Sequence, residues 1–282
     1  MFALFAPTTL GQSKARVVHA FVALADNQHQ GIIPAPANLG NGDDPQHNLY
    51  WGAAFGVKTF FNKAPEWREI ASVLGPKSSI LERIIFEDRT KSVFLVADAY
   101  RGSEIKQALA DFFNAAAGLQ ETGPLYSSAK GSVNYEISSD SDVVVYVEPD
   151  GLMDFPLTLD FAKRSPSNRA AIILACASKS FFSDLLRTSG AQPLLWTTGL
   201  MAPEAYALKA ALDGWMLNQN IEQIRHRAAA AYAEYQKCSL TAALRLFPTL
   251  GDSSAVSPEF PYVRIRESKC CGAFTSSSAS SA

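Results

Sequence analysis

The stretch AIILACASKSFF, residues 171–182, carries the clearest sign of the fold. Five apolar residues, Ala171 to Ala175, run without a break into Cys176, and small and polar residues follow at once. A short apolar run of this kind is typical of a strand buried on both faces, as in a parallel sheet covered by helices. Ligands and catalytic groups collect at the carboxyl ends of such strands. Cys176 is therefore either a small core residue or a nucleophile.

Apolar runs and helix-period segments alternate along most of the chain. Further short strands are predicted at 17–24, 92–98, 142–147 and 193–198. Apolar residues at three- and four-residue steps predict helices at 50–61, 105–116, 203–217 and 221–247, the last with Cys238 on its buried face. This alternation predicts an α/β fold with three layers, α/β/α, a mostly parallel central sheet and C-terminal helices.

The composition divides the chain into one large domain and two flanking segments. Residues 16–247 are expected to form the α/β domain, since 48% of the 282 residues are hydrophobic. We interpret residues 1–15 as a flexible N-terminus or a degenerate signal segment, because only residues 2–6 are continuously apolar and a secretory segment needs roughly 7–15. Residues 248–282, rich in serine, predict a largely disordered tail.

Charge and motifs exclude several classes of protein. With 25 basic and 27 acidic side chains and a net charge of −2, the sequence predicts no nucleic-acid partner. It holds no apolar stretch near the ~18 residues of a membrane span. No glycine-rich phosphate loop follows the first strand, so no nucleotide or other cofactor is expected, and without CxxC spacing no metal site is expected. We expect a cytoplasmic location or, second, a secreted or periplasmic one; a monomer and an oligomer fit the sequence equally.

A long loop follows the first predicted strand. Residues 26–48 have no helix or strand pattern but hold two of the four histidines, His29 and His47. A loop of more than ~15 residues in a compact domain is usually a lid, a binding loop or a disordered segment.

Polar residues follow each predicted strand and should meet at one edge of the sheet. The expected positions are Asp26 and Asn27 after the first strand, Arg101 after the second, Glu148, Asp150 and Gly151 after the third, and Thr198 at the end of the fifth. Arg101 is expected to anchor an anion or a neighbouring carboxylate. The other positions are candidates for contacts to a substrate.

The order of these elements resembles the caspase and legumain superfamily of cysteine peptidases. Two strand–helix pairs precede a third strand with a polar turn, and the fourth strand ends in Ala175-Cys176. Over residues 16–215 the resemblance implies a caspase-like fold with Cys176 as the nucleophile and a peptide or protein as substrate. It also implies a catalytic histidine in the turn at 148–151.

The turn at 148–151 departs from the family pattern, because Pro149 stands where the histidine is expected. Proline cannot accept a proton, and a thiol titrates near ~8.5 unless a cation lowers its pKa or a carboxylate raises it. Two residues are candidates for the missing base: Glu148 in the turn, and His29 in the loop after the first strand.

Three functions remain open on the sequence. The first is a caspase-like cysteine peptidase or related hydrolase that uses Cys176. The second is a pseudoenzyme that keeps the fold and binds a peptide or protein partner at the same edge. The third is an unrelated doubly wound domain that binds a small ligand where the strand order reverses.

Overall fold

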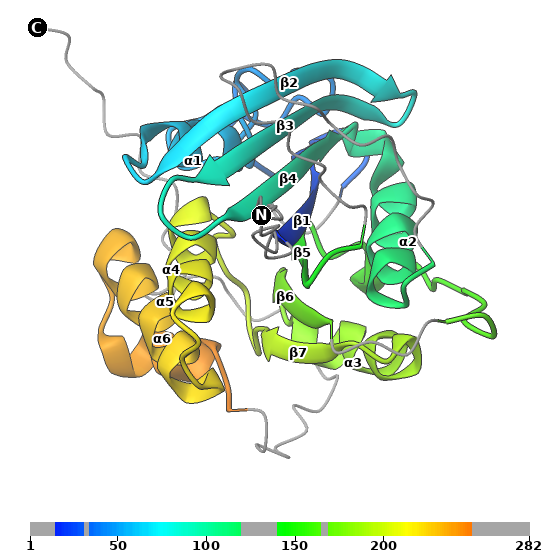
Figure 1. Ribbon diagram of the computed structural model, residues 1–282. Helices are drawn as coiled ribbons and strands as arrows, with labels where there is room; N and C mark the ends of the chain where they lie inside the picture. The colour runs from blue at the N-terminus through cyan, green and yellow to red at the C-terminus, as the bar shows by residue number, and fades with distance from the viewer. Residues whose placement is uncertain (1–14, 31–33, 120–139, 165–168, 250–282) are drawn as a thin grey trace, which may run out of the picture.

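In the part of the chain that the structure describes, seven strands form one sheet in the order β2-β3-β4-β1-β5-β6-β7. The computed structural model describes residues 15–30, 34–119, 140–164 and 169–249 (Figure 1). The strands are β1 (Arg16–Ala23), β2 (Trp67–Lys77), β3 (Ile80–Asp88), β4 (Val93–Tyr100), β5 (Val143–Val147), β6 (Ala170–Leu174) and β7 (Gln192–Leu195). The helices within these residues are α1 (Val57–Lys63), α2 (Ile105–Ala116), α3 (Ser178–Ser189), α4 (Ala205–Met216), α5 (Ile221–Gln236) and α6 (Leu240–Leu246).

The sheet is mostly parallel, as predicted. β4, β1, β5, β6 and β7 run parallel, and their registers place Leu95, Val18 and Val143 side by side. All five strands predicted from the sequence are present. The antiparallel hairpin β2–β3, which extends the sheet beyond β4, was not predicted.

Helices cover both faces of the sheet, which gives the predicted three layers. In Figure 1, α2 and α3 lie on one side of the sheet and α1, α4, α5 and α6 on the other. β1 faces both layers: Val18, Ala20 and Val22 pack in one apolar core, and Phe21 and Ala23 pack in the other. Such two-sided burial explains why β5 and β6 are continuous apolar runs.

Two predicted helices are wrong in their extent. Residues 50–56 form turns, and only 57–63 are helical. Gly52 and Gly56 cause the difference, because a Cβ on either would lie within 2.5 Å of the backbone of the preceding turns. The tight turn they allow removes Tyr50 from any helix face.

The predicted helix over 221–247 is two helices, α5 and α6. Lys237 ends α5 in the left-handed conformation, with φ 54°, and the Ser239 side chain accepts a hydrogen bond from Ala242 N at the start of α6. Cys238 lies between the two helices and is half-buried against the core, rather than on the buried face of a helix.

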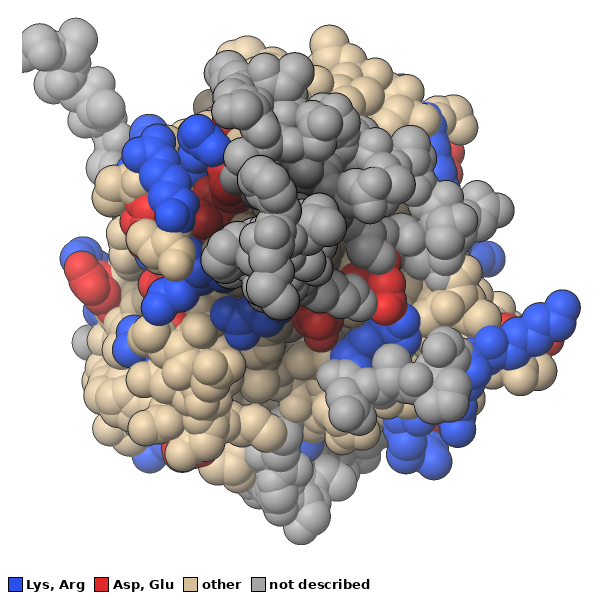
Figure 2. Space-filling model, in the orientation of Figure 1, with Lys and Arg blue, Asp and Glu red and all other residues tan. Residues whose placement is uncertain are grey.

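The surface and the flanking segments add two observations. Figure 2 shows Lys and Arg interspersed with Asp and Glu over the described part of one face. No helix among the described residues is long and apolar enough to cross a membrane. The predicted N-terminal segment, apart from Ala15, and the predicted tail from residue 250 lie outside the described residues.

Candidate functional site

The five parallel strands end at one edge of the sheet, and the strand order reverses at β1. The chain leaves β1 to form β4 on one side of it and later returns to place β5 on the other. Ligand sites of open α/β sheets lie at the carboxyl edge near such a reversal. Asp26 follows β1, Glu148 follows β5, and Cys176 follows β6 in this region.

Cys176 lies in a sharp turn between β6 and α3. Ala177, with φ 49°, takes the left-handed conformation, and its amide donates to Gly199 O at 2.9 Å. The buried Cys176 Sγ accepts a hydrogen bond from Met201 N at 3.4 Å and lies 3.8 Å from Met201 O, to which the thiol donates. The segment after β7 therefore fixes the thiol in place.

The turn after β5 places two carboxyl groups inside the protein. The Tyr146 hydroxyl donates to Pro149 O at 2.8 Å, and Asp150 Oδ1 accepts from Leu152 N at 3.0 Å. Glu148 is 4% exposed and Asp150 is 1% exposed. Within the described chain, neither Glu148 Oε1 nor Asp150 Oδ2 has a hydrogen-bond partner.

Burial changes the acidity of these carboxyl groups. It raises the pKa of Glu148 to about 7, although hydrogen bonding from Cys176 and from the Asp150 amide lowers that pKa in part. Burial, with the Glu148 charge beside it, raises the pKa of Asp150 to about 8. Both groups are therefore protonated to a large extent near neutral pH.

The same surroundings keep Cys176 in its thiol form. Burial is the largest cause of a pKa well above the ordinary value of cysteine, and the charges of Glu148 and Asp150 raise the pKa further. The backbone of Met201 offsets this only in part. Reactive cysteines commonly have a cation beside them that lowers the pKa, whereas the charged groups beside Cys176 are carboxyls, which raise it.

Two residues that the sequence did not single out belong to this region. Burial raises the pKa of the Tyr50 phenol, and the nearby Glu148, Cys176 and Glu204 raise it further. In the sequence, Tyr50 belongs to the apolar pattern that predicts a helix at 50–61. Glu204 lies at the start of the helix predicted at 203–217. No sequence signal marked either residue, because their proximity to Cys176 arises from tertiary contacts.

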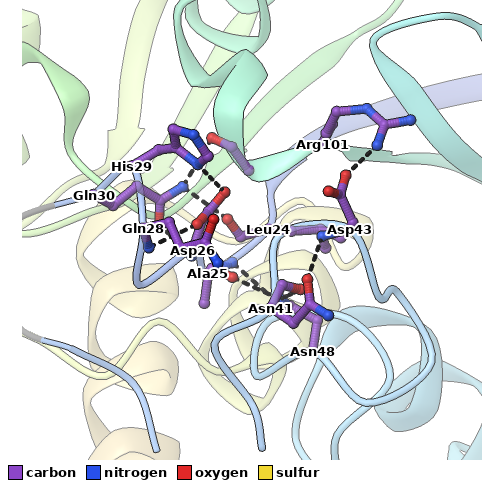
Figure 3. A network of polar contacts seen from close by, with 11 residues as sticks. Leu24, Ala25, Asp26, Gln28, His29, Gln30, Asn41, Asp43, Asn48 and Arg101 are labelled. Atoms are coloured by element: carbon purple, nitrogen blue, oxygen red, sulfur yellow. Dashed lines mark hydrogen bonds and ion pairs between the residues drawn. The ribbon is translucent and has the colours of Figure 1, made fainter. Parts of the chain in front are cut away.

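Side-chain amides form many of the hydrogen bonds in the described part of the loop after β1 (Figure 3). Asn48 binds Ala25 N and Ala25 O at 3.0 and 2.9 Å, and Asn41 O at 2.9 Å. Gln30 binds Asp26 N at 2.8 Å. Asn27, a predicted substrate contact, uses its side chain to bind both the amide and the carbonyl of Ala35. These amides take the place of backbone partners in a segment without helix or strand.

Asp26 and His29 form a hydrogen-bonded pair in this loop (Figure 3). His29 Nδ1 lies 2.8 Å from Asp26 Oδ2, with 54% of the histidine side chain exposed and 8% of the aspartate side chain. Gly42 and Gly102 make room for the carboxylate, because a Cβ on either would lie 2.3 Å from Asp26. None of the contacts of Cys176 among the described residues involves His29.

The remaining predicted site residues have structural contacts. Arg101 forms an ion pair with Asp43, so a loop carboxylate occupies it (Figure 3). The Thr198 hydroxyl donates to Arg245 O at 2.8 Å, which holds the end of α6. A Cβ on Gly151 would lie 2.8 Å from the side chains of Ile105 and Phe155, so this glycine allows the turn after β5 to pack against α2.

The described residues include no group of three or more His, Cys, Asp or Glu side chains arranged to hold a metal ion. Comparisons of the chain with protein-family models, with curated proteins and with solved structures find no match.

Proposed function

We propose that this protein is a caspase-like scaffold without cysteine-peptidase activity, which binds a peptide or protein partner at the carboxyl edge of its sheet. One observation carries the proposal: Cys176 is buried beside carboxyl groups that raise the pKa of its thiol. A thiol in these surroundings is a poor nucleophile, since the thiolate is the reactive form.

The turn after β5 supports a binding role. In the resemblance to caspases this turn supplies the catalytic histidine, but here it supplies Glu148 and Asp150, whose unpartnered oxygens lie inside the protein. Buried oxygens without partners cost free energy unless another group satisfies them. A bound partner with hydrogen-bond donors would satisfy both.

An active cysteine peptidase is the second candidate, and the Asp26–His29 pair favours it. A buried carboxylate that binds Nδ1 orients an imidazole and leaves Nε2 free to act as a base. Against this, Asp44 and His47 form the same i,i+3 pair at 2.8 Å on the exposed part of the loop. The same Asp–His contact therefore occurs in two turns with the sequence D-x-Q-H, so it is also a local feature of such turns.

Thiol alkylation separates the two candidates. The intact protein is treated with iodoacetamide from about pH 5 to about pH 9, and each cysteine is followed by peptide mass mapping. We expect Cys176 to remain unmodified over this range, while the half-buried Cys238 serves as the internal control. Rapid alkylation of Cys176 below about pH 7, lost in His29→Ala, would establish the peptidase candidate instead.

Binding is tested on an array of short peptides of varied sequence. We expect the wild-type protein and Cys176→Ala to retain the same peptides, and mass spectrometry to find no new peptide termini after incubation. Cleavage that disappears in Cys176→Ala would contradict the proposal.

A further inference from the structure

We infer that Asn41, in the loop after β1, is a site of spontaneous deamidation, and that the isoaspartate product loosens the contact of this loop with the carboxyl edge of the sheet. The reaction involves only the chain and water, so it is independent of the partner proposed above.

The residue that follows Asn41 favours this reaction. Asn41 is the one asparagine of the chain that precedes a glycine. Deamidation begins when the backbone nitrogen of the next residue attacks the side-chain amide carbon, and a Cβ on that residue hinders the attack. Gly42 has no Cβ, so its nitrogen reaches Asn41 Cγ with the least steric resistance. Asn38, which is exposed in the same loop, precedes Leu39 and provides the natural comparison.

The surroundings of Asn41 favour attack on its side-chain amide. Asn41 is exposed, and its Oδ1 accepts a hydrogen bond from Asp43 N at 3.0 Å (Figure 3). Oδ1 carries the negative charge of the tetrahedral intermediate, so the Asp43 amide stabilises that charge where it develops. The attacking Gly42 amide donates no hydrogen bond to any described residue. No existing bond of this nitrogen within the described chain therefore has to break before the attack.

The reaction has two steps and consumes one water molecule. The Gly42 nitrogen bonds to Asn41 Cγ and the Cγ–Nδ2 bond breaks, so that ammonia leaves with the proton of the Gly42 amide. Water then opens the five-membered ring. Opening at one carbonyl gives aspartate, and opening at the other gives isoaspartate, in which the main chain runs through the former side chain.

Gly42 is a contact between the loop and the carboxyl edge. Gly102 N, in the turn before α2, donates to Gly42 O at 2.9 Å. Gly42 is buried, and a Cβ on it would lie 2.3 Å from Asp26 Oδ2. The backbone at this point therefore has no room to move toward Asp26.

Isoaspartate at position 41 disturbs this contact in two ways. It lengthens the main chain by one methylene group directly before Gly42, which displaces Gly42 O from Gly102 N because Asp26 blocks the inward direction. It also adds a carboxylate to a loop that already holds Asp43 and Asp44, and like charges repel. Both effects weaken the hold of the loop on the edge of the sheet.

The first measurement follows the modification itself. The full chain is kept at about pH 8 and about 37 °C, and tandem mass spectrometry detects the gain of about one dalton when an amide becomes a carboxyl group. A protein isoaspartyl methyltransferase with labelled S-adenosylmethionine counts the isoaspartate. We expect Asn41 to convert at least about tenfold faster than Asn38. Asn41→Gln should remove the fast reaction, because glutamine would have to form a six-membered ring, and Asn38→Gln is the matched control that should leave it unchanged.

The second measurement is hydrogen exchange of the loop contact. Ion exchange separates the isoaspartate form, because it carries one more negative charge. The Gly102 amide should exchange faster in this form than in the unmodified protein, since its acceptor is Gly42 O. Amides of β5 should exchange as before, and Asn41→Gln kept under the same conditions should retain slow exchange at Gly102.

Each part can be overturned separately. Conversion of Asn41 no faster than that of Asn38 would overturn the assignment of this site, because it would mean that the turn around Asn41 prevents the attack. Rapid conversion with unchanged exchange of the Gly102 amide would overturn the loosening of the loop. Peptide binding and alkylation of Cys176 are measured separately, so neither result decides the function proposed above.

Discussion

At the residue scale, Asp98 is the clearest example of a charge that the fold satisfies. The side chain lies fully buried in β4, where Arg83 Nε and an Arg83 terminal nitrogen lie 2.5 and 2.6 Å from its two oxygens. His19 Nε2 lies 2.9 Å from Asp98 Oδ2. Burial raises the pKa of Asp98, but Arg83 and His19 more than offset this and hold it below its usual value. The contrast with Glu148, whose pKa is raised, shows what a nearby cation does to a buried carboxyl.

Asp98→Asn should destabilise the protein by about 3 kcal/mol, because it leaves the half-buried Arg83 guanidinium opposite a neutral amide. Urea unfolding at neutral pH measures the change. Asp184→Asn, on the exposed face of α3, should leave the unfolding midpoint nearly unchanged. An Asp98→Asn midpoint equal to that of the wild type would contradict the role given to this ion pair.

At the scale of elements, the sequence patterns predicted the five parallel strands, of which β5 and β6 consist of apolar residues throughout. The helix α2 has the predicted bounds. The hairpin β2–β3 escaped prediction because β2 is largely half-exposed and mixes polar with apolar residues, although Gly75-Pro76 in the same stretch is a turn signal. The positions of Cys176 and Glu148 at one edge followed from strand order. Tyr50 and Glu204 did not, because their proximity arises from tertiary contacts of turns.

The loop after β1 depends on Asn48, which is buried and joins the end of β1 to two later turns. Asn48→Ala should cost about 2–3 kcal/mol, because Ala25 N and Ala25 O lose their partners inside the protein. Hydrogen exchange should show faster exchange of the Ala25 amide. Asn38→Ala, at an exposed position of the same loop, is the matched control. Unchanged exchange at Ala25 would mean that the loop does not depend on this side chain.

At the scale of the whole molecule, the two kinds of buried carboxyl set opposite limits on stability. Asp98 has a lowered pKa, so its contribution is lost only as pH falls through that low value. Glu148 and Asp150 have raised pKa values, so the folded state keeps protons that the unfolded chain releases above about pH 4.5. Stability should therefore fall as pH rises toward and through about 7 and 8.

This fall should amount to a few kcal/mol between about pH 5 and about pH 9, measured by urea unfolding under reducing conditions. Glu148→Gln with Asp150→Asn should flatten the profile over this range, because the variant has no proton to lose at either position. Asp184→Asn should keep the wild-type profile. A flat wild-type profile would mean that both carboxyls ionise as in an unfolded chain.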